Sequence, residues 1–290
     1  MTLELIHEPK ISKLTTLGIG GSAQALATVR DIDGLDELSV FMEKQSARII
    51  ALGNGSNMLA ADGKLDIVFI KVSPEKIPEP ELQGTSVKVH AASALPRLLG
   101  FFTYNGLSGM EGLCGIPGTV GGAVAMNAGS YGTDISASLE KVRLWTPSKG
   151  LFWKDKTEIE FGYRHFNPGT DEFTLVWEAV FELNKADRDK IKKELNAVIS
   201  RKKTTQPILE RTAGCVFKNP ENESAGKLLD QAGFKGKKNG GMAFSTIHAN
   251  FLVNKDHGTG SQAMELLDEA VAAVKDKFNV TLEHEVVILK

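Results

Sequence analysis

The stretch "GMEGLCGIPGTVGGAVAMNAGSYG", residues 109–132, holds eight glycines and a single charged residue, Glu111. It is too apolar for a flexible linker, and glycine lets a backbone pass close to a ligand or to another segment because it has no Cβ. The small uncharged residues could therefore line a long cofactor. A purely structural glycine-rich loop is the alternative, because glycines also serve tight backbone packing. The Lys-Ser/Thr pair of a P-loop is missing from this stretch, so the sequence does not favour ATP hydrolysis.

A second glycine-rich segment lies earlier in the chain, in "RIIALGNGSNML", where a strand is expected to run into residues 53–57. This segment begins like the Gly-x-Gly of a dinucleotide fingerprint. Met58 stands where the third glycine should be, and no long helix follows, so a Rossmann site is disfavoured. The segment could cradle phosphate through its backbone N–H groups, or it could be an ordinary turn.

Composition limits the other possibilities. The chain has 290 residues, with 34 Lys+Arg against 36 Asp+Glu and a formal net charge of -2, so neither nucleic acid nor a membrane surface is an expected partner. Two distant cysteines, Cys114 and Cys215, and six scattered histidines predict neither a disulfide framework nor a metal site. No long apolar run and no leader-like start are recognised, so we expect a cytoplasmic protein, and a monomer.

The order of expected elements mixes helices and strands without regular alternation. A helix near residues 34–47 followed by the strand "RIIALG" resembles half of a βαβ unit, and "DIVFIKV", "SVKVHAA" and a helix ending at Gly106 come next. The strands "KVRLWTP", "LFWK" and "FTLVWEAVFEL" make the middle region mainly β. A charged helix follows from Asp187. The remainder alternates "GCVFKN", "SAGKLLDQAG", "ANFLVN", a long helix with a capping box at Thr259 and Gln262, and a last strand "TLEHEVVIL".

Eight short strings, taken in order, resemble one known family. They are "LGNGSNML", "GIPGTVGGAVAMNAGSYG", "FGYR", "RKKTTQP", "AGCVFKNP", "AGKLLDQAG", "HANFLVN" and "LEHEVVIL". Any one string alone is weak evidence for a family. Together and in register, the eight strings resemble the UDP-N-acetylenolpyruvoylglucosamine reductases, which are bacterial peptidoglycan enzymes. The resemblance runs almost from end to end, beginning near "TTLGIGGSA". The short interval after Arg164 is similar to the compact form of the family that lacks an extra substrate-covering loop.

The resemblance implies an α+β fold, with a vanillyl-alcohol-oxidase-type FAD-binding module of two subdomains followed by a C-terminal α+β substrate-binding lobe. We expect the module at residues 1–187, with subdomains of about 1–72 and 73–187, and the lobe at residues 188–290. FAD would bind noncovalently, with NADPH as hydride donor. The residues expected to hold FAD lie in the two glycine-rich segments: Gly53, Asn54, Gly55, Ser56, Asn57, Gly115, Ile116, Pro117, Gly118, Thr119, Gly122 and Gly129.

The resemblance also implies three catalytic residues. Arg164 matches the position that meets negative charge building on the substrate, Cys215 matches the proton donor, and Glu285 matches the third position. Without the motifs, Arg164 would be interpreted as a surface ion pair, Cys215 as a buried apolar thiol and Glu285 as solvated surface.

Four features depart from the family pattern. Many members have serine where this chain has Cys215, and a thiol is a stronger acid but a poorer hydrogen-bond donor than a hydroxyl. Phe166 stands where Ser or Thr is common, and His284 stands where Pro is frequent. Val287 takes the place of a frequent arginine, so no contact with the substrate carboxylate is transferred to it.

The uridine diphosphate part of the substrate is expected to meet the second lobe. The candidates in matched motifs are Gln206, Asn219, Lys203, Lys218 and Lys227. Lysines are usually just solvated, so the first two are ranked higher. Two other functions have less support: a different FAD oxidoreductase acting on a sugar or alcohol, which the C-terminal motifs argue against, and a flavin- or nucleotide-binding protein without catalysis, which the three expected catalytic residues argue against.

Overall fold

The computed structural model describes residues 2–290, and its chain forms two compact units that are discontinuous in sequence. Unit 1 comprises Met1–Ile6, Ala25–Asn54 and Ile67–Arg201, and unit 2 comprises His7–Gln24, Gly55–Asp66 and Lys202–Lys290. The contiguous division at residue 187 stays a prediction. No helix within residues 2–290 combines the length and the apolar character needed to cross a lipid bilayer.

The first sheet of unit 1 carries the expected helix and strand pair. Its strand order is β1-β2-β5-β3, from β1 (Leu3–His7), β2 (Ser22–Val29), β5 (Lys64–Val72) and β3 (Arg48–Ala51). β3 runs parallel to β5, and helix α1 (Asp33–Met42) buries Leu35 and Leu38 in a cluster with Val68 and Ile70 of β5. The expected helix followed directly by a strand is confirmed.

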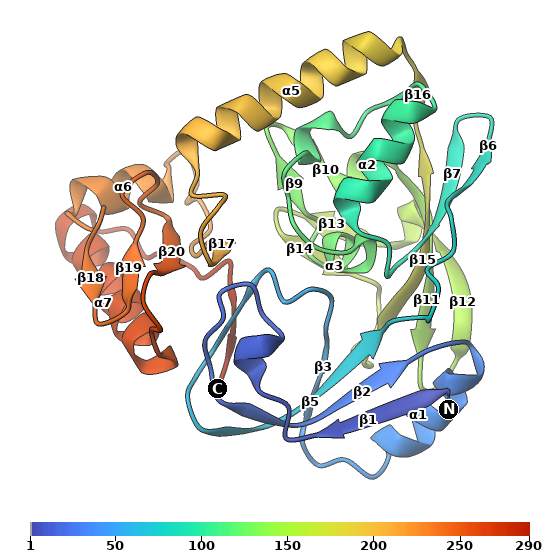
Figure 1. Cartoon of the computed structure of the whole chain (residues 1–290), viewed down its shortest axis with the longest axis horizontal. Helices are drawn as coiled ribbons and strands as arrows, with labels where there is room; N and C mark the ends of the chain where they lie inside the picture. Colours follow the sequence, from blue (N-terminus) through green and yellow to red (C-terminus); the bar gives the residue numbers. More distant parts are fainter. Residues whose placement is uncertain (1) are drawn as a thin grey trace. The chain divides into compact units, whose positions relative to one another are not determined.

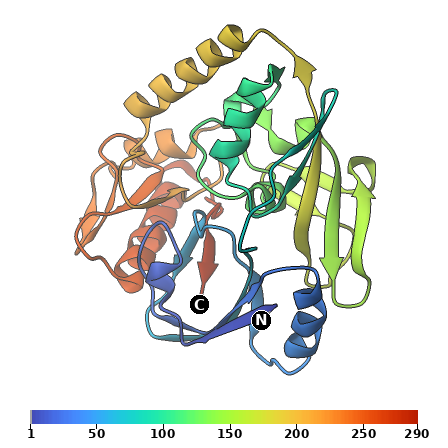
Figure 2. The same cartoon turned by 45° about the vertical axis from the view of Figure 1, so that its right-hand side comes forward.

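The second sheet of unit 1 is antiparallel throughout and has the order β12-β11-β15-β7-β6 (Figure 1). Its strands are β12 (Gly150–Asp155), β11 (Leu139–Thr146), β15 (Leu175–Glu182), β7 (Ser86–His90) and β6 (Glu81–Gln83). Helices α2 (Leu95–Tyr104) and α3 (Val120–Ala125) lie on one face of it in both views (Figures 1 and 2). Their apolar side chains share one core with the sheet, including Phe102 of α2, Val124 of α3 and Phe181 of β15.

Helix α3 was not expected, because no secondary structure was predicted for the glycine-rich stretch. Val120, Ala123 and Val124 follow helical spacing and are buried, and the Thr119 side chain caps the helix by accepting the Gly122 N–H at 3.2 Å. Burial of one apolar stripe outweighs the low helix propensity of the two glycines.

Smaller elements complete unit 1. The hairpin β13 (Glu160–Gly162) and β14 (His165–Asn167) carries the "FGYR" motif at the end of β13 and in its turn. The others are η2 (Glu111–Leu113), α4 (Ile135–Ser138), η3 (Lys156–Glu158), the antiparallel pair β8 (Leu107–Ser108) and β16 (Asn184–Lys185), and the antiparallel pair β9 (Gly129–Ser130) and β10 (Thr133–Asp134). Helix α5 (Arg188–Thr205) is the expected charged helix, and its residues from Lys202 onward belong to unit 2.

Unit 2 is built on a four-stranded antiparallel sheet of order β17-β20-β19-β18. The strands are β17 (Thr212–Cys215), β20 (Phe251–Asn254), β19 (Met242–Phe244) and β18 (Lys238–Asn239). Helices α6 (Ala225–Gln231) and α7 (Gly260–Phe278) bury their apolar faces with it, and the capping box at Thr259 and Gln262 is confirmed. The remaining short helix is η1 (Ile11–Lys13).

The last strand is shorter than expected. Only β21 (Val287–Leu289) is a strand, and it pairs in parallel with β4 (Met58–Ala60). Residues 281–286 are irregular because their backbone bonds go to a different partner: Glu285 donates to the Val216 carbonyl at 2.9 Å, and His284 bridges to Phe217. The expectation of one continuous strand over "TLEHEVVIL" is therefore wrong.

Candidate active site

Unit 1 contains a cavity of about 390 Å³, a size typical of cofactor pockets. The chain after β3 reaches it at Gly53 and Asn54, and the start of α3 reaches it at Thr119, Gly121 and Gly122. The rest of its wall comes from the end of β3 and the residue after it, from β5 and the chain after it, from the residues after β7, from the end of α3, from β14 and the residues after it, and from the start of β15: Ala51, Leu52, Ile70, Lys71, Val72, Ser73, Ile77, Ala91, Ala92, Ala125, Phe166, Pro168, Thr170, Glu172, Thr174, Leu175 and Val176.

The two glycine-rich segments approach each other at this cavity. A Cβ added at Gly53 would lie 2.9 Å from Thr119 Oγ1, and one added at Gly121 would lie 2.9 Å from Ala91 Cβ. A backbone hydrogen bond fixes the second of these contacts, because Gly121 donates to the Ala91 carbonyl at 2.9 Å. Because Gly53 and Gly121 have no side chains, the cavity wall at these positions consists mostly of backbone and small groups.

His90, which the sequence did not single out, supports this wall. It is 7 % exposed, its ring meets that of Trp177 edge-on at 5.3 Å, and its Nδ1 accepts the Ala92 N–H at 3.2 Å. Burial lowers the pKa of His90, which the nearby Glu178 carboxylate opposes. The neutral ring with an accepting Nδ1 holds residues 91–92 at the cavity. Burial of a histidine leaves no signal in a single sequence.

The residues at the cavity fit an FAD site. Small groups and exposed backbone from two glycine-rich segments leave room for an extended cofactor to lie against the main chain. Of the predicted cofactor residues, the structure brings together Gly53, Asn54, Thr119 and Gly122 in this lining. The other eight lie outside the lining residues given above, and their role in holding FAD stays a prediction: Gly55, Ser56, Asn57, Gly115, Ile116, Pro117, Gly118 and Gly129.

Residues 55–57 belong to unit 2 and have contacts of their own there. Gly55, with φ +60°, packs so closely on residue 14 that a Cβ would lie 2.2 Å from the Leu14 carbonyl oxygen. Asn57 Nδ2 donates to the Glu285 carbonyl at 3.0 Å, and the Asn57 carbonyl accepts the Val287 N–H at 2.9 Å. This part of the first glycine-rich segment thus fixes the backbone at a predicted catalytic residue, Glu285, and two residues after it.

Arg164 lies in unit 1, in the turn between β13 and β14, with a left-handed φ of +53°. Its side chain is 17 % exposed. Nη2 donates to the Gly129 carbonyl at 2.8 Å, Nη1 is 4.0 Å from an Asp134 carboxylate oxygen, and the guanidinium lies 5.0 Å from the centre of the Tyr163 ring. The glycine-rich segment thus supplies a contact that orients this arginine.

Cys215 and Glu285 lie in unit 2, where the structure brings their segments together. Cys215 ends β17 opposite Phe251 of β20. The next residue, Val216, accepts the Glu285 N–H at 2.9 Å, so Glu285 is held between β17 on one side and Asn57 on the other. Both side chains are half-buried.

The predicted substrate-binding residues all lie in unit 2 and are spread over several elements. Asn219 is exposed, and its Oδ1 accepts the Ala225 N–H at 3.0 Å at the start of α6. Lys218 is 3.5 Å from a Glu283 carboxylate oxygen, and Lys227 is exposed on α6. Lys203 is exposed near the end of α5, and the half-buried Gln206 follows directly after that helix. Their contact with substrate stays a prediction.

Lys202, beside the predicted Lys203, was missed. It is 2 % exposed, which is unusual for a lysine. A signal existed in the sequence, because Ile191, Leu195 and Val198 share a helix face and position 202 continues their spacing. The apolar stripe of α5 thus ends on a buried lysine.

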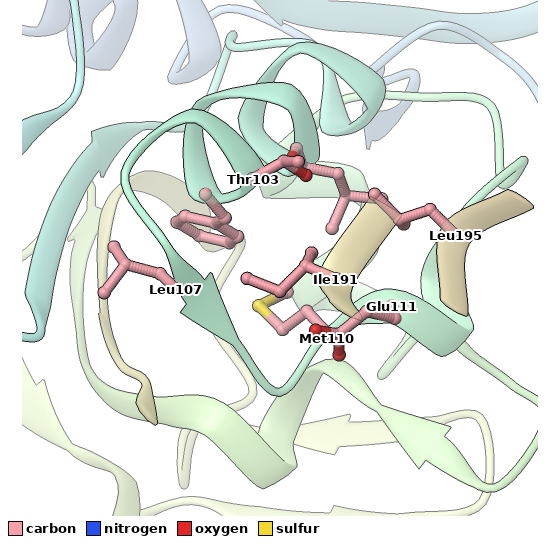
Figure 3. Close-up of a pocket in the computed structure, with 8 residues that line it drawn as sticks. Thr103, Leu107, Met110, Glu111, Ile191 and Leu195 are labelled. Atoms are coloured by element: carbon pink, nitrogen blue, oxygen red, sulfur yellow. The ribbon is translucent and has the colours of Figure 1, made fainter. Parts of the chain in front are cut away.

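A second cavity in unit 1 is small and mostly apolar (Figure 3). Its volume is about 10 Å³, enough for about one water molecule. Figure 3 shows Ile191 and Leu195 of α5 facing Met110 and Leu107 across it. Glu111 Oε2 accepts the Gly109 N–H at 2.9 Å, whereas Glu111 Oε1 is buried with no hydrogen-bond partner among the described residues.

Comparisons with known proteins agree with this arrangement. The sequence model of an FAD-binding domain matches residues 23–154, and that of the UDP-N-acetylenolpyruvoylglucosamine reductase C-terminal domain matches residues 206–289. The UDP-N-acetylenolpyruvoylglucosamine reductase of Nitratidesulfovibrio vulgaris is 44 % identical over 99 % of both chains. That of Oleidesulfovibrio alaskensis is 42 % identical over 98 % of this chain and 97 % of its own.

A solved structure extends the likeness to the fold. The crystal structure of UDP-N-acetylenolpyruvylglucosamine reductase from Thermus caldophilus has a TM-score of 0.83 at 32 % identity, covering 99 % of each chain. The expected fold class, α+β with an FAD-binding module of the vanillyl-alcohol-oxidase type and a C-terminal lobe, is confirmed. The chain belongs to the UDP-N-acetylenolpyruvoylglucosamine reductase family.

Proposed function

We infer that this protein uses FAD and NADPH to reduce the enolpyruvyl group of UDP-N-acetylglucosamine enolpyruvate to UDP-N-acetylmuramate, a step of peptidoglycan synthesis. The observation that carries this inference is the end-to-end likeness to reductases of that name, at 44 % identity over 99 % of the chain. The match of residues 206–289 to the reductase C-terminal domain disfavours a different FAD oxidoreductase acting on another sugar or alcohol.

FAD would be held at the cavity of unit 1 by Gly53, Asn54, Thr119 and Gly122. When bound there, it supplies the hydride carrier between NADPH and the substrate. We expect noncovalent binding, because no histidine or cysteine stands in a flavin-linking motif. Acid precipitation should therefore release the yellow colour into solution, and protein that cannot be loaded with FAD would contradict the assignment.

Arg164 is proposed to stabilise the negative charge that builds on the substrate when hydride is added to its vinyl group. A fixed cation is worth more in a water-poor site than in water, and it needs no reorganisation as the charge develops. The contact with the Gly129 carbonyl and the low exposure of the Arg164 side chain support this role.

Cys215 is proposed to donate the Sγ proton to the carbon that becomes negatively charged, and Glu285 is the third group proposed to act on this charge. A hydroxyl at position 215 can replace the donor, whereas a methyl group cannot. Cys215→Ser should therefore keep turnover, whereas Cys215→Ala should still accept hydride from NADPH and pass it to the substrate very slowly. Rapid transfer in the alanine variant would show that the proton comes from elsewhere.

The uridine diphosphate moiety is proposed to contact Gln206 and Asn219 first, and Lys203, Lys218 and Lys227 as more distant positive charges. Asn219 also caps α6, so Asn219→Asp, which keeps the accepting oxygen, is a better test than alanine. The variant should raise KM for the sugar nucleotide and leave KM for NADPH unchanged. We further propose that the protein is a cytoplasmic monomer without a nucleic-acid or membrane partner, which size-exclusion chromatography and fractionation can test.

The decisive experiment follows the two half-reactions of the purified protein. The yellow protein should bleach with NADPH and regain its colour quickly when the enolpyruvyl sugar nucleotide is added without oxygen. A simple sugar or alcohol should not restore the colour. Recovery with those compounds, and not with the sugar nucleotide, would instead favour the other class of FAD oxidoreductase.

A further inference from the structure

Asn127 is a buried polar residue to which the catalytic assignment gives no role. It lies in the glycine-rich segment two residues after α3, and it is 3 % exposed. Its φ of +38° is left-handed, which asparagine tolerates better than most residues. A buried amide is costly unless its polar atoms are bonded, so its contacts indicate what it holds in place.

Both polar atoms of the Asn127 side chain are bonded. Nδ2 donates to the Gly162 carbonyl at 2.7 Å, and Oδ1 accepts the Ser136 N–H at 3.3 Å. Gly162 is the last residue of β13 and pairs with His165 of β14, so residues 163–164 form the turn of that hairpin. The amide of Asn127 therefore fastens the hairpin at the base of the turn that carries Arg164.

The same segment holds the turn at a second point. Gly129, two residues after Asn127, accepts Arg164 Nη2 at 2.8 Å. Arg164 itself has a φ of +53°, which is unfavourable for a residue with a side chain unless its surroundings maintain it. The bond from Asn127 holds the backbone at Gly162, two residues before Arg164, and the bond to Gly129 holds the guanidinium. Residues 127–129 therefore contact both the hairpin backbone and the arginine side chain.

We propose that Asn127 is a positioning residue for Arg164: it fixes the turn of the β13–β14 hairpin so that the guanidinium meets the charge that develops on the substrate. This role rests on the proposed function. Without the Asn127 amide, the hairpin keeps its own backbone pairing but loses its tie to the segment after α3. A shift of about 1 Å in a group that stabilises a transition state can slow a reaction about a hundredfold.

The test uses Asn127→Gly, which removes the amide and keeps a residue that accepts positive φ. Asn279→Gly is the matched control, because Asn279 is also left-handed, with φ +57°, and follows helix α7 at an exposed position. Stopped-flow traces of FAD absorbance should show bleaching by NADPH within about twofold of wild type. Recovery of colour with the sugar nucleotide should slow about tenfold or more. The control should match wild type in both steps.

A double variant separates positioning from a general loss of structure. If Asn127 acts through Arg164, Asn127→Gly in an Arg164→Ala background should slow colour recovery by less than about twofold further. Equal slowing of both half-reactions, or a further tenfold loss in the Arg164→Ala background, would overturn the proposal. If Asn127→Gly does not fold or retain FAD, Asn127→Asp, which keeps Oδ1 but loses the donor, is judged by the same two criteria.

Failure of the proposed function would look different. In that case the wild-type protein itself would not regain colour with the enolpyruvyl sugar nucleotide. If wild type responds and the Asn127 variants lose both half-reactions equally, the function stands and the positioning role falls.

Discussion

The two glycine-rich segments, residues 53–57 and 115–132, were both expected to hold FAD. In the structure each segment has two parts with different contacts. One part of each lines the cavity of unit 1: Gly53 and Asn54 in the first segment, and Thr119 with its neighbours in α3 in the second. The other part of each holds the backbone near a proposed catalytic residue. Asn57 bonds to Glu285, and Asn127 fastens the turn that carries Arg164.

The segments differ in how they reach their partners. Asn57 contacts a residue 228 positions later in the chain, whereas Asn127 contacts one 35 positions later. Gly55 is glycine because the backbone of Leu14 crowds it, whereas Gly132 has open space where a Cβ would be. A glycine in these segments therefore marks either a close approach, to a ligand or to the chain itself, or a left-handed backbone conformation.

The largest expected effects come from the proposed catalytic residues that contact the two segments. Arg164→Ala and Glu285→Gln should each slow the recovery of FAD colour with the sugar nucleotide by about a hundredfold or more, the scale for loss of an electrostatic stabiliser. Bleaching by NADPH should stay near wild type. Arg97→Ala, on the exposed face of α2, is the control. Stopped-flow traces with equal losses in both steps would contradict the assigned roles.

The next effect is on the free energy of unfolding, and it compares two glycines with left-handed φ. Gly55→Ala should destabilise the protein by about 2–4 kcal/mol, because the φ of +60° and the Leu14 carbonyl both oppose a Cβ. Gly132→Ala should cost about 1 kcal/mol, because only its φ of +76° is unfavourable. Chemical unfolding of the two variants measures the difference. Equal midpoints would show that the packing at Leu14 relaxes easily.

A smaller effect is expected at Asn57. Asn57→Ala removes the donor to the Glu285 carbonyl and, in protein loaded with FAD, should slow colour recovery with the sugar nucleotide about tenfold. Asn184→Ala, an exposed asparagine on β16, is the matched substitution. Loss of FAD from the Asn57 variant, with normal rates once FAD is restored, would show that Asn57 acts on the cofactor and not through the Glu285 backbone.

The smallest effect concerns His90, which holds residues 91–92 at the cavity, where Ala91 contacts Gly121 of the second segment. Burial lowers the pKa of His90 in the folded protein, so the unfolded chain binds more protons as the pH falls below about 6.5, and stability should fall with it. His90→Asn keeps an acceptor for the Ala92 N–H and removes the titrating ring. The melting temperature of the variant should drop less between pH 7.5 and pH 5.5. An unchanged drop would assign the acid sensitivity to other groups, such as His248, whose pKa burial also lowers.

Much of the fold was predictable because it depends on local patterns. Aromatic and β-branched residues predicted the strands of the middle region, and the apolar stripe from Ile191 predicted α5. Helix α3 was missed because glycine is a poor helix former, and its stability comes from the burial of Val120 and Val124 in a core the sequence does not display. The last strand was predicted to be longer than it is, because its pairing depends on a segment far away in sequence.

The site was predictable only at the level of motifs. Motif matching indicated Arg164, Cys215 and Glu285, but not the bonds that orient them. Which glycines face the cavity depends on how residues 91–95 and 118–121 lie along each other, which no local pattern encodes. Asn127 was hidden for the same reason, because its partner is the carbonyl of Gly162, a backbone group that any residue there would carry.

The long-range contact of Asn57 has a consequence for how the chain is made. Synthesis proceeds at about 5–20 residues per second, so the 228 residues that separate Asn57 from Glu285 take on the order of 10 to 50 s to appear. During that time β4 has no strand β21 to pair with, although Leu59 and Ala60 are fully buried in the finished protein. The nascent chain must therefore keep this apolar strand soluble until β21 has been translated, and codon changes that slow translation between them would lengthen the exposure.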